Sequence, residues 1–379
     1  MRTFALEAYF SQWEFTAKHN MTASDVQSMT IEDLLRHASD DDRRAYETAW
    51  LGYSQTWGMP ELRDQIAGTY DTLSAENILC FAGAEEGIYA AMRVMLTAKD
   101  HAIVVVPNYQ AAETIPLDIC DVTGVGLDEQ NDWRLDLNKV EAAFRDNTSL
   151  VSINFPNNPT GALMPREDLQ ELISLCRHHD CYLFSDEVYR QLERREEWRL
   201  PQVADEYEKG LSLNVLSKAY GLPGLRIGWV AGKDTGLLQR MERYKHYLSI
   251  CNTVPGERLA LIALKARDAI LSRNRALIAA NLVKLNAFFD DYAEMFDWSE
   301  PRGGCIGFPR YKGTPAVDEF CESLVKDEGV LLLPASLYRS ELMATPPDRF
   351  RIGFGRANID EGLQAFRHYL DRHAGEHAA

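Results

Sequence analysis

Short apolar runs recur along the first two thirds of the chain, separated by longer segments with helical spacing. These runs cover residues 77–81, 102–106, 150–155, 182–185, 211–216 and 226–231. Most of their positions are apolar or β-branched, without the polar alternation of a half-exposed strand. Such runs are typical of strands that are buried on both faces of a parallel sheet. The pattern therefore predicts a parallel sheet covered by helices.

The segments between these runs have the period of amphipathic helices. In residues 85–96, Ile88, Ala91, Met92 and Met95 fall on one helical face. Residues 166–178 show a similar pattern and follow Pro165, a residue suited to the start of a helix. Strands that alternate with helices in this way predict an α/β fold with a doubly wound, mostly parallel sheet.

The pattern changes after about residue 255, where long helical stretches begin with the charged, Ala/Leu-rich residues 258–288. A smaller α+β unit follows, and the first 45 residues do not share the α/β alternation either. A chain of 379 residues also exceeds the usual size of a single core. We predict a large domain over residues 46–285 and a small domain formed by residues 1–45 and 286–379.

Composition narrows the classes of function. The chain has 40 Lys and Arg against 57 Asp and Glu, a formal charge of −17. This charge disfavours binding to nucleic acid or to an anionic membrane surface. No apolar stretch approaches a membrane span, and the amino terminus lacks the uninterrupted apolar core of a signal peptide. We expect a cytoplasmic protein.

The cysteines point neither to a disulfide framework nor to a metal site. There are seven of them, scattered without framework spacing, so reduced thiols are expected. Residues 176–181 read CRHHDC, but this spacing matches no structural zinc pattern. We predict no bound metal.

A lysine in an unusual loop carries the first chemical signal. Residues 217–226 read SKAYGLPGLR and directly follow a predicted strand, which places Lys218 at the strand end and Arg226 eight residues later. An amine in this position can attack a cofactor aldehyde, while a guanidinium close by can hold two oxygens of a phosphate. This arrangement suggests a covalently held phosphate cofactor.

Two further strand ends carry polar motifs. Residues 154–161 read NFPNNPTG, and residues 185–189 read SDEVY. The carboxyl ends of parallel strands meet at one edge of a sheet, where open α/β folds bind ligands. Together with the lysine loop, the motifs Asn-Asn-Pro-Thr-Gly, Asp-x-x-Tyr and Ser-Lys-(x)₇-Arg resemble class I/II aminotransferases of the pyridoxal 5′-phosphate (PLP) dependent fold type I, the aspartate-aminotransferase fold. The resemblance covers about residues 46–360.

The resemblance implies roles for five side chains around PLP and its substrate. Lys218 would form a Schiff base with the cofactor and later act as general base. Asp186 would pair with the pyridine nitrogen, and Asn158 and Tyr189 would hydrogen-bond the ring hydroxyl oxygen. Arg351 would bind the substrate α-carboxylate with Asn158 beside it.

The phosphate and ring contacts are implied in the same way. Gly83, Ala84 and Glu85 lie where a strand leads into a helix, so their backbone N–H groups can face an anion at the positive helix end. Arg226 would hold the phosphate from the other side. Tyr109 resembles the aromatic residue that stacks on the cofactor ring.

Other positions either extend the resemblance or depart from it. Tyr53 resembles the tyrosine that reaches the phosphate of the neighbouring subunit, which implies a homodimer with shared sites. Val215 replaces the usual phosphate-binding Ser or Thr, so Ser217 becomes the candidate for this contact.

The glycine segment that normally lines the substrate pocket is also absent near the amino terminus. This region instead resembles capreomycidine-synthase-like enzymes, which act on arginine derivatives, and Glu14 or Asp25 could bind a guanidinium.

Three functions follow as hypotheses. The first is a PLP-dependent aminotransferase of amino-acid metabolism or biosynthesis, acting on an amino acid and a 2-oxo acid. The second is an eliminating, cyclising or decarboxylating enzyme of the same fold, since the motifs do not report which substrate bond breaks. The third is a non-catalytic PLP-binding regulator, which is disfavoured because no basic DNA-binding module precedes Tyr53.

Overall fold

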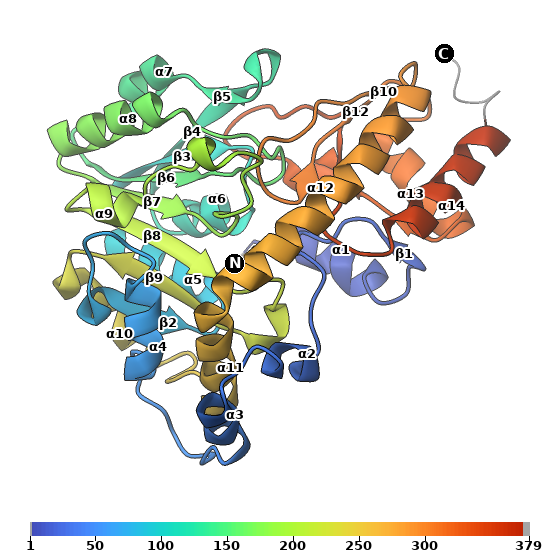
Figure 1. Ribbon diagram of the computed structural model, residues 1–379. Coiled ribbons are helices and arrows are strands. Elements are labelled where there is room, and N and C mark those ends of the chain that lie inside the picture. Colours follow the sequence, from blue (N-terminus) through green and yellow to red (C-terminus); the bar gives the residue numbers. More distant parts are fainter. Residues whose placement is uncertain (1, 374–379) are drawn as a thin grey trace.

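A central sheet of eight strands forms the larger part of the protein (Figure 1). The computed structural model describes residues 2–373. The strands lie in the order β2, β9, β8, β7, β6, β3, β4 and β5. Their bounds are β2 Ile78–Phe81, β3 His101–Val106, β4 Asp121–Asp128, β5 Arg134–Leu135, β6 Thr148–Asn154, β7 Tyr182–Asp186, β8 Gly210–Val215 and β9 Gly228–Gly232. All six predicted runs are strands of this sheet.

The sheet is mostly parallel, but not entirely so. Neighbouring strands from β4 through β3, β6 and β7 to β8 run parallel. β9 is antiparallel to both β8 and β2, and the short edge strand β5 is antiparallel to β4. The prediction of a mostly parallel sheet is confirmed, with β9 as an antiparallel strand inside it. Between β8 and β9 lies only a loop with one 3-10 turn, η4 (Pro223–Leu225), and no crossover helix that could return the chain to a parallel start.

Helices cover both faces of the sheet. One face packs side chains such as Ile103 and Val105 against the helical residues Leu172 and Cys176, whereas Ala102 and Phe184 belong to the core on the opposite face. This alternation explains why the strand sequences are apolar throughout. The helices of this part are α4 Pro60–Ala67, α5 Ala84–Met95, α6 Ala111–Leu117, α7 Leu137–Ala143, α8 Arg166–His178, α9 Val203–Glu206, α10 Thr235–Lys245 and α11 Val254–Lys265.

The 25-residue helix α12 (Arg267–Asp291) runs from the central sheet to the smaller part of the molecule (Figure 1). Three small sheets lie there, with strand orders β11-β15-β14, β10-β12 and β1-β13. The elements are β1 His19–Asn20, β10 Phe296–Asp297, β11 Ile306–Gly307, β12 Arg310–Tyr311, β13 Val330–Leu331, β14 Leu333–Pro334, β15 Phe350–Gly353, α13 Val317–Asp327 and α14 Ile359–Arg372.

The amino-terminal segment contacts both parts of the molecule. Its elements are α1 Ala5–Trp13, β1, α2 Ile31–Leu35 and α3 Asp40–Glu47. β1 pairs in parallel with β13, whereas α2 and α3 pack on α11. The proposed domain limit at residue 285 falls inside α12, so this helix belongs to both parts. None of the helices within residues 2–373 is long and apolar enough to cross a membrane.

Candidate active site

A cavity of about 550 Å³ opens at the carboxyl ends of the parallel strands, between the sheet and the smaller part. Most of the residues singled out in the sequence line it. These are Ala84, Glu85, Tyr109, Asn158, Asp186, Tyr189, Ser217, Lys218, Arg226 and Arg351. Gly83 lies directly before Ala84 at the start of α5, and Tyr53 lies on the surface with 83% of its area exposed. The fold thus brings segments that are far apart in the sequence to one cavity, which Glu14, Asp25 and Val215 also line.

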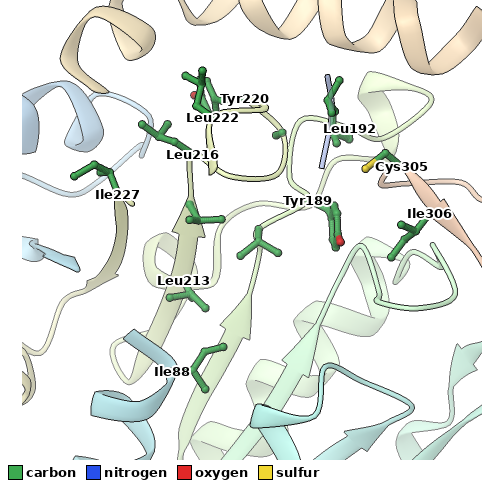
Figure 2. Close-up of a cluster of buried hydrophobic side chains, with 14 of the residues drawn as sticks. Ile88, Tyr189, Leu192, Leu213, Leu216, Tyr220, Leu222, Ile227, Cys305 and Ile306 are labelled. Carbon is green, nitrogen blue, oxygen red and sulfur yellow. The ribbon is translucent and has the colours of Figure 1, made fainter. Parts of the chain in front are cut away.

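Lys218 follows β8 in a loop whose apolar side chains are buried. Leu216, Tyr220 and Leu222 hold this loop to the core, as Figure 2 shows. The Lys218 Nζ donates a hydrogen bond to Ser24 Oγ at 2.8 Å. Burial lowers the pKa of Lys218, although the charges of Asp25 and Asp186 oppose this effect. A lowered pKa favours the neutral amine, which is the nucleophilic form.

Asp186 is the last residue of β7 and is buried at the floor of the cavity. Its Oδ1 accepts a hydrogen bond from the Val188 N–H at 3.1 Å. Burial raises the pKa of Asp186 to about 7, while the hydrogen bond and the Lys218 charge act in the opposite direction. A cation bound next to this carboxyl group would favour its ionised form.

A buried cluster joins Arg351 of β15 to Tyr338, Asn158 and Thr22. The Arg351 Nη1 donates to Tyr338 Oη at 2.6 Å and to Asn158 Oδ1 at 3.3 Å, and its Nη2 donates to the Thr22 carbonyl at 2.7 Å. Tyr338 Oη also donates to Asn158 Oδ1 at 3.3 Å. Because its oxygen serves these two donors, Asn158 keeps its –NH₂ group for a ligand.

Several buried polar atoms at the cavity have no hydrogen-bond partner within residues 2–373. They are the Tyr189 hydroxyl, Glu85 Oε2 and Arg351 Nε. Burial raises the pKa of Tyr189 well above its usual value, so its hydroxyl keeps its proton and can donate. Buried polar groups are normally paired, so unpaired groups around a cavity indicate a ligand. The Tyr189 hydroxyl is a donor suited to the ring oxygen of PLP, and Arg351 Nε is a donor suited to a carboxylate.

The phosphate end of the predicted site lies at the start of α5. Gly83 precedes this helix with φ +95°, a conformation that strains other residues, and a Cβ there would collide with the Arg226 guanidinium. Arg226 donates only to the carbonyls of Pro223 and Ala82, and within residues 2–373 it forms no ion pair. The Gly83 N–H donates to the Phe81 carbonyl at 2.8 Å, so the backbone donors left at this helix start are those of Ala84 and Glu85. These N–H groups beside an unpaired guanidinium suit a phosphate.

Helix α1 covers the cavity. Phe4 packs on Tyr109 with ring centroids 5.3 Å apart, and the Tyr109 hydroxyl donates to Glu7 Oε1 at 3.1 Å. Glu7, Phe10 and Glu14 all line the cavity. The α1 side chains therefore form part of the cavity wall.

The two carboxylates considered for a guanidinium differ in their contacts. Asp25 is buried and accepts two hydrogen bonds from Arg356 Nη2, at 2.8 and 3.0 Å. Glu14 forms no ion pair with any residue that the structure describes. Burial, followed by the Glu7 and Asp25 charges, raises the pKa of Glu14. Glu14 is therefore the carboxylate left for a cationic group.

The structure adds residues that sequence reasoning missed. Ser24 contacts Lys218, Tyr338 contacts both Arg351 and Asn158, and Glu7 contacts Tyr109. None of them lies in a motif, and only their place in the fold identifies them. Val215 is buried in the core, and Ser217 lines the cavity in its vicinity. Within residues 2–373, no group of three or more His, Cys, Asp or Glu side chains could hold a metal ion.

Comparison with known proteins places these features in context. The sequence pattern described as aminotransferase class I and II matches residues 16–366. The chain is 28% identical to a capreomycidine synthase from Streptomyces vinaceus over 97% of this chain and 94% of the relative. It is 33% identical to an arginine–pyruvate transaminase from Pseudomonas aeruginosa over 48% of each chain. A PLP-dependent aminotransferase from Streptococcus suis 89-1591 superposes with a TM-score of 0.90, at 29% identity and 98% coverage of both chains.

Proposed function

The chain belongs to the class I and II aminotransferase family, a family that uses PLP, and we propose that it is an aminotransferase that moves an amino group from an amino acid to a 2-oxo acid. The observation that carries this proposal is the convergence of Lys218, Asp186, Tyr189 and Arg351 on one cavity. Lys218 and Asp186 lie at the ends of neighbouring strands of the sheet. Arg351 comes from the smaller part and faces them.

Each side chain has a task that its environment supports. PLP, when bound, supplies an electron sink for the pair left at the substrate α-carbon. The Asp186 carboxylate would hold the proton on the pyridine nitrogen. Tyr189 and the Asn158 amide would donate hydrogen bonds to the ring oxygen. Lys218, once displaced by the substrate amine, would be a free amine with a lowered pKa, able to take the proton from the α-carbon and deliver it to the cofactor C4′.

Arg351 is suited to the substrate carboxylate. It is 1% exposed, its hydrogen bonds go to neutral oxygens, and no carboxylate of residues 2–373 pairs with it. A buried guanidinium without a counter-charge costs free energy until an anion binds. The substrate carboxylate would supply this anion.

Single-turnover absorbance tests the proposal. An amino acid alone should convert bound cofactor to its amine form, and a 2-oxo acid should then restore the original spectrum. Screening the common amino acids and arginine derivatives identifies the donor. Release of ammonia or pyruvate with no need for a 2-oxo acid would contradict transamination.

A second candidate is a PLP-dependent lyase or cyclising enzyme that acts on an arginine-derived amino acid. Glu14, which has no ion-pair partner within the described residues, favours a cationic substrate, as does the similarity to capreomycidine synthase and to an arginine–pyruvate transaminase. Elimination also needs a leaving group on the substrate β-carbon. A β-substituted arginine that reacts without a 2-oxo acid, when arginine itself does not, would support this candidate.

Glu14→Gln tests whether the substrate is cationic, whichever type of reaction the protein catalyses. Loss of the charge should lower kcat/KM for arginine about tenfold and leave that for a neutral amino acid unchanged. Glu47→Gln, which alters an exposed carboxylate on α3, is the control. Equal effects on both substrates would argue against a guanidinium contact.

We also propose a homodimer with shared active sites. Trp50, Leu51 and Tyr53 are more than three quarters exposed, and Tyr247 is 93% exposed. The Lys245 Nζ donates to the Thr56 carbonyl, so the two segments that carry these side chains adjoin. An exposed group of large apolar residues is typical of an interface. A partner that covers it would receive Tyr53 at its own phosphate site.

Subunit mixing tests this arrangement. Lys218→Ala and Tyr53→Ala chains should each be nearly inactive alone. A mixed dimer has one site with both Lys218 and Tyr53 intact, so random reassociation should restore about a quarter of wild-type activity. A monomer by light scattering, or no recovery on mixing, would contradict shared sites.

A further inference from the structure

Lys245, the last residue of α10, is fully buried outside the cavity. Its Nζ donates to the Thr56 carbonyl at 2.6 Å, the Cys80 carbonyl at 2.7 Å and Asn252 Oδ1 at 2.7 Å. Burial lowers the pKa of Lys245, but three acceptors require three N–H donors. The side chain is therefore an ammonium group with every donor in use.

Two carboxylates face this ammonium, but neither bonds to it. Glu257 accepts from Ser54 Oγ at 2.7 Å and from the Met59 N–H at 3.1 Å. Glu86 accepts from the Ala82 N–H at 2.6 Å and from the Ser249 N–H at 3.0 Å. Lys245 thus contacts neutral oxygens that belong to segments far apart in the sequence.

Two of these segments would contact the phosphate bound by this chain, and the third carries Tyr53, which would reach the phosphate of the partner subunit. Thr56 lies in the loop that carries Tyr53, and Cys80 lies in β2, three residues before Gly83. Asn252, held by Lys245, donates to the Phe81 carbonyl at 2.7 Å and to the Arg226 carbonyl at 3.5 Å. Lys245 and Asn252 therefore link the Tyr53 loop, the strand before Gly83 and the Arg226 turn.

We propose that Lys245 is a positioning residue for the phosphate site of PLP. Its side chain fixes the relative placement of these three segments. The proposal rests on the proposed function, with the start of α5 and Arg226 at the phosphate of this chain and Tyr53 at that of the partner subunit. Precise backbone placement matters here because Val215 offers no hydroxyl to the phosphate. No segment that Lys245 holds supplies a side chain to the pyridine nitrogen or the ring oxygen.

Because Lys245 acts only on the phosphate side of the site, a comparison of two cofactors separates loss of phosphate positioning from a general loss of folded structure. Apo-protein is titrated with PLP and with pyridoxal, which lacks the phosphate, and binding is followed by absorbance. Lys245→Met should raise Kd for PLP about tenfold or more while Kd for pyridoxal changes less than about twofold. A parallel rise in both constants, or no change in either, would overturn the proposal.

Controls keep the result interpretable. Lys265→Met, a half-exposed lysine on α11, should leave both constants unchanged. Lys245→Gln retains two donors and should recover part of the PLP affinity. If Lys245→Met does not fold, Asn252→Ala is judged by the same ratio of the two constants. If the wild-type protein binds neither compound, the proposed function itself fails. If the wild-type protein binds both and the ratio of the two constants is unchanged in the variants, only the role of Lys245 fails.

Discussion

The Lys218 amine is hydrogen-bonded to the Ser24 hydroxyl at 2.8 Å, although 194 residues separate them. Ser24 belongs to the amino-terminal segment, and Lys218 lies at the end of a central strand. The backbone supports the same contact, since the Val26 N–H donates to the Lys218 carbonyl at 3.4 Å. The amino-terminal segment is thus a part of the proposed site and not only a cover over it.

Ser24→Ala should leave the Lys218 amine less firmly oriented, while Lys218 remains attached to the cofactor. We expect kcat to fall several-fold, because one hydrogen bond contributes about 1 kcal/mol. The cofactor absorbance should persist. Ser174→Ala, which removes a hydroxyl bonded to the Gln170 carbonyl on α8, is the control. Unchanged kcat in Ser24→Ala would show that the contact has no role in proton transfer.

Lys218→Ala should abolish covalent attachment of PLP while the fold remains intact. Borohydride reduction followed by mass spectrometry measures the attachment, and circular dichroism measures the fold. Lys139→Ala, an exposed lysine on α7, should retain the reducible adduct. An adduct that persists in Lys218→Ala would identify another lysine as the anchor.

Arg351→Lys should mainly impair recognition of the substrate carboxylate. Lysine keeps the charge but loses the planar pair of donors, so we expect KM to rise about 10- to 100-fold with a smaller effect on kcat. Initial rates at varied amino-acid concentration measure this. Arg349→Lys, two residues away, changes a guanidinium that pairs with Glu129 and provides a matched control. An unchanged KM would remove Arg351 from the substrate site.

Asp186 should make the stability of the apo-protein depend on pH. Its pKa is raised from 3.8 to about 7, so between these values the folded protein holds more protons than the unfolded chain. The free energy of unfolding therefore falls as pH rises through this window, by a few kcal/mol from this group. Asp186→Asn removes this dependence.

The measurement compares apo wild type with apo Asp186→Asn by thermal unfolding at several pH values. The wild-type Tm, relative to that of the variant, should fall between about pH 4 and pH 7. Bound PLP should diminish this pH dependence of the Tm difference, because its pyridinium stabilises the carboxylate. A constant Tm difference across the window would contradict a raised pKa.

The strands, the family and the cofactor could all be predicted from the amino-acid sequence. Each strand is buried on both faces, so its residues are apolar throughout, and this local property is visible without a structure. The motifs around Lys218, Asp186 and Asn158 are equally local, because each lies within a few residues of one strand end. The comparisons confirm the family, the fold and PLP, while the roles of the individual residues stay predictions.

The direction of β9, the cover formed by α1 and the hydrogen-bond partners of the proposed site residues could be seen only in the folded chain. Ser24 contacts Lys218 across 194 residues, and Tyr338 contacts Asn158 across 180. Such contacts depend on how separate elements pack, and a short segment carries no periodicity or spacing that reports them. For the same reason Lys245 resembles any helix-terminal lysine in the sequence, and only the packing of three segments around it shows that it is buried.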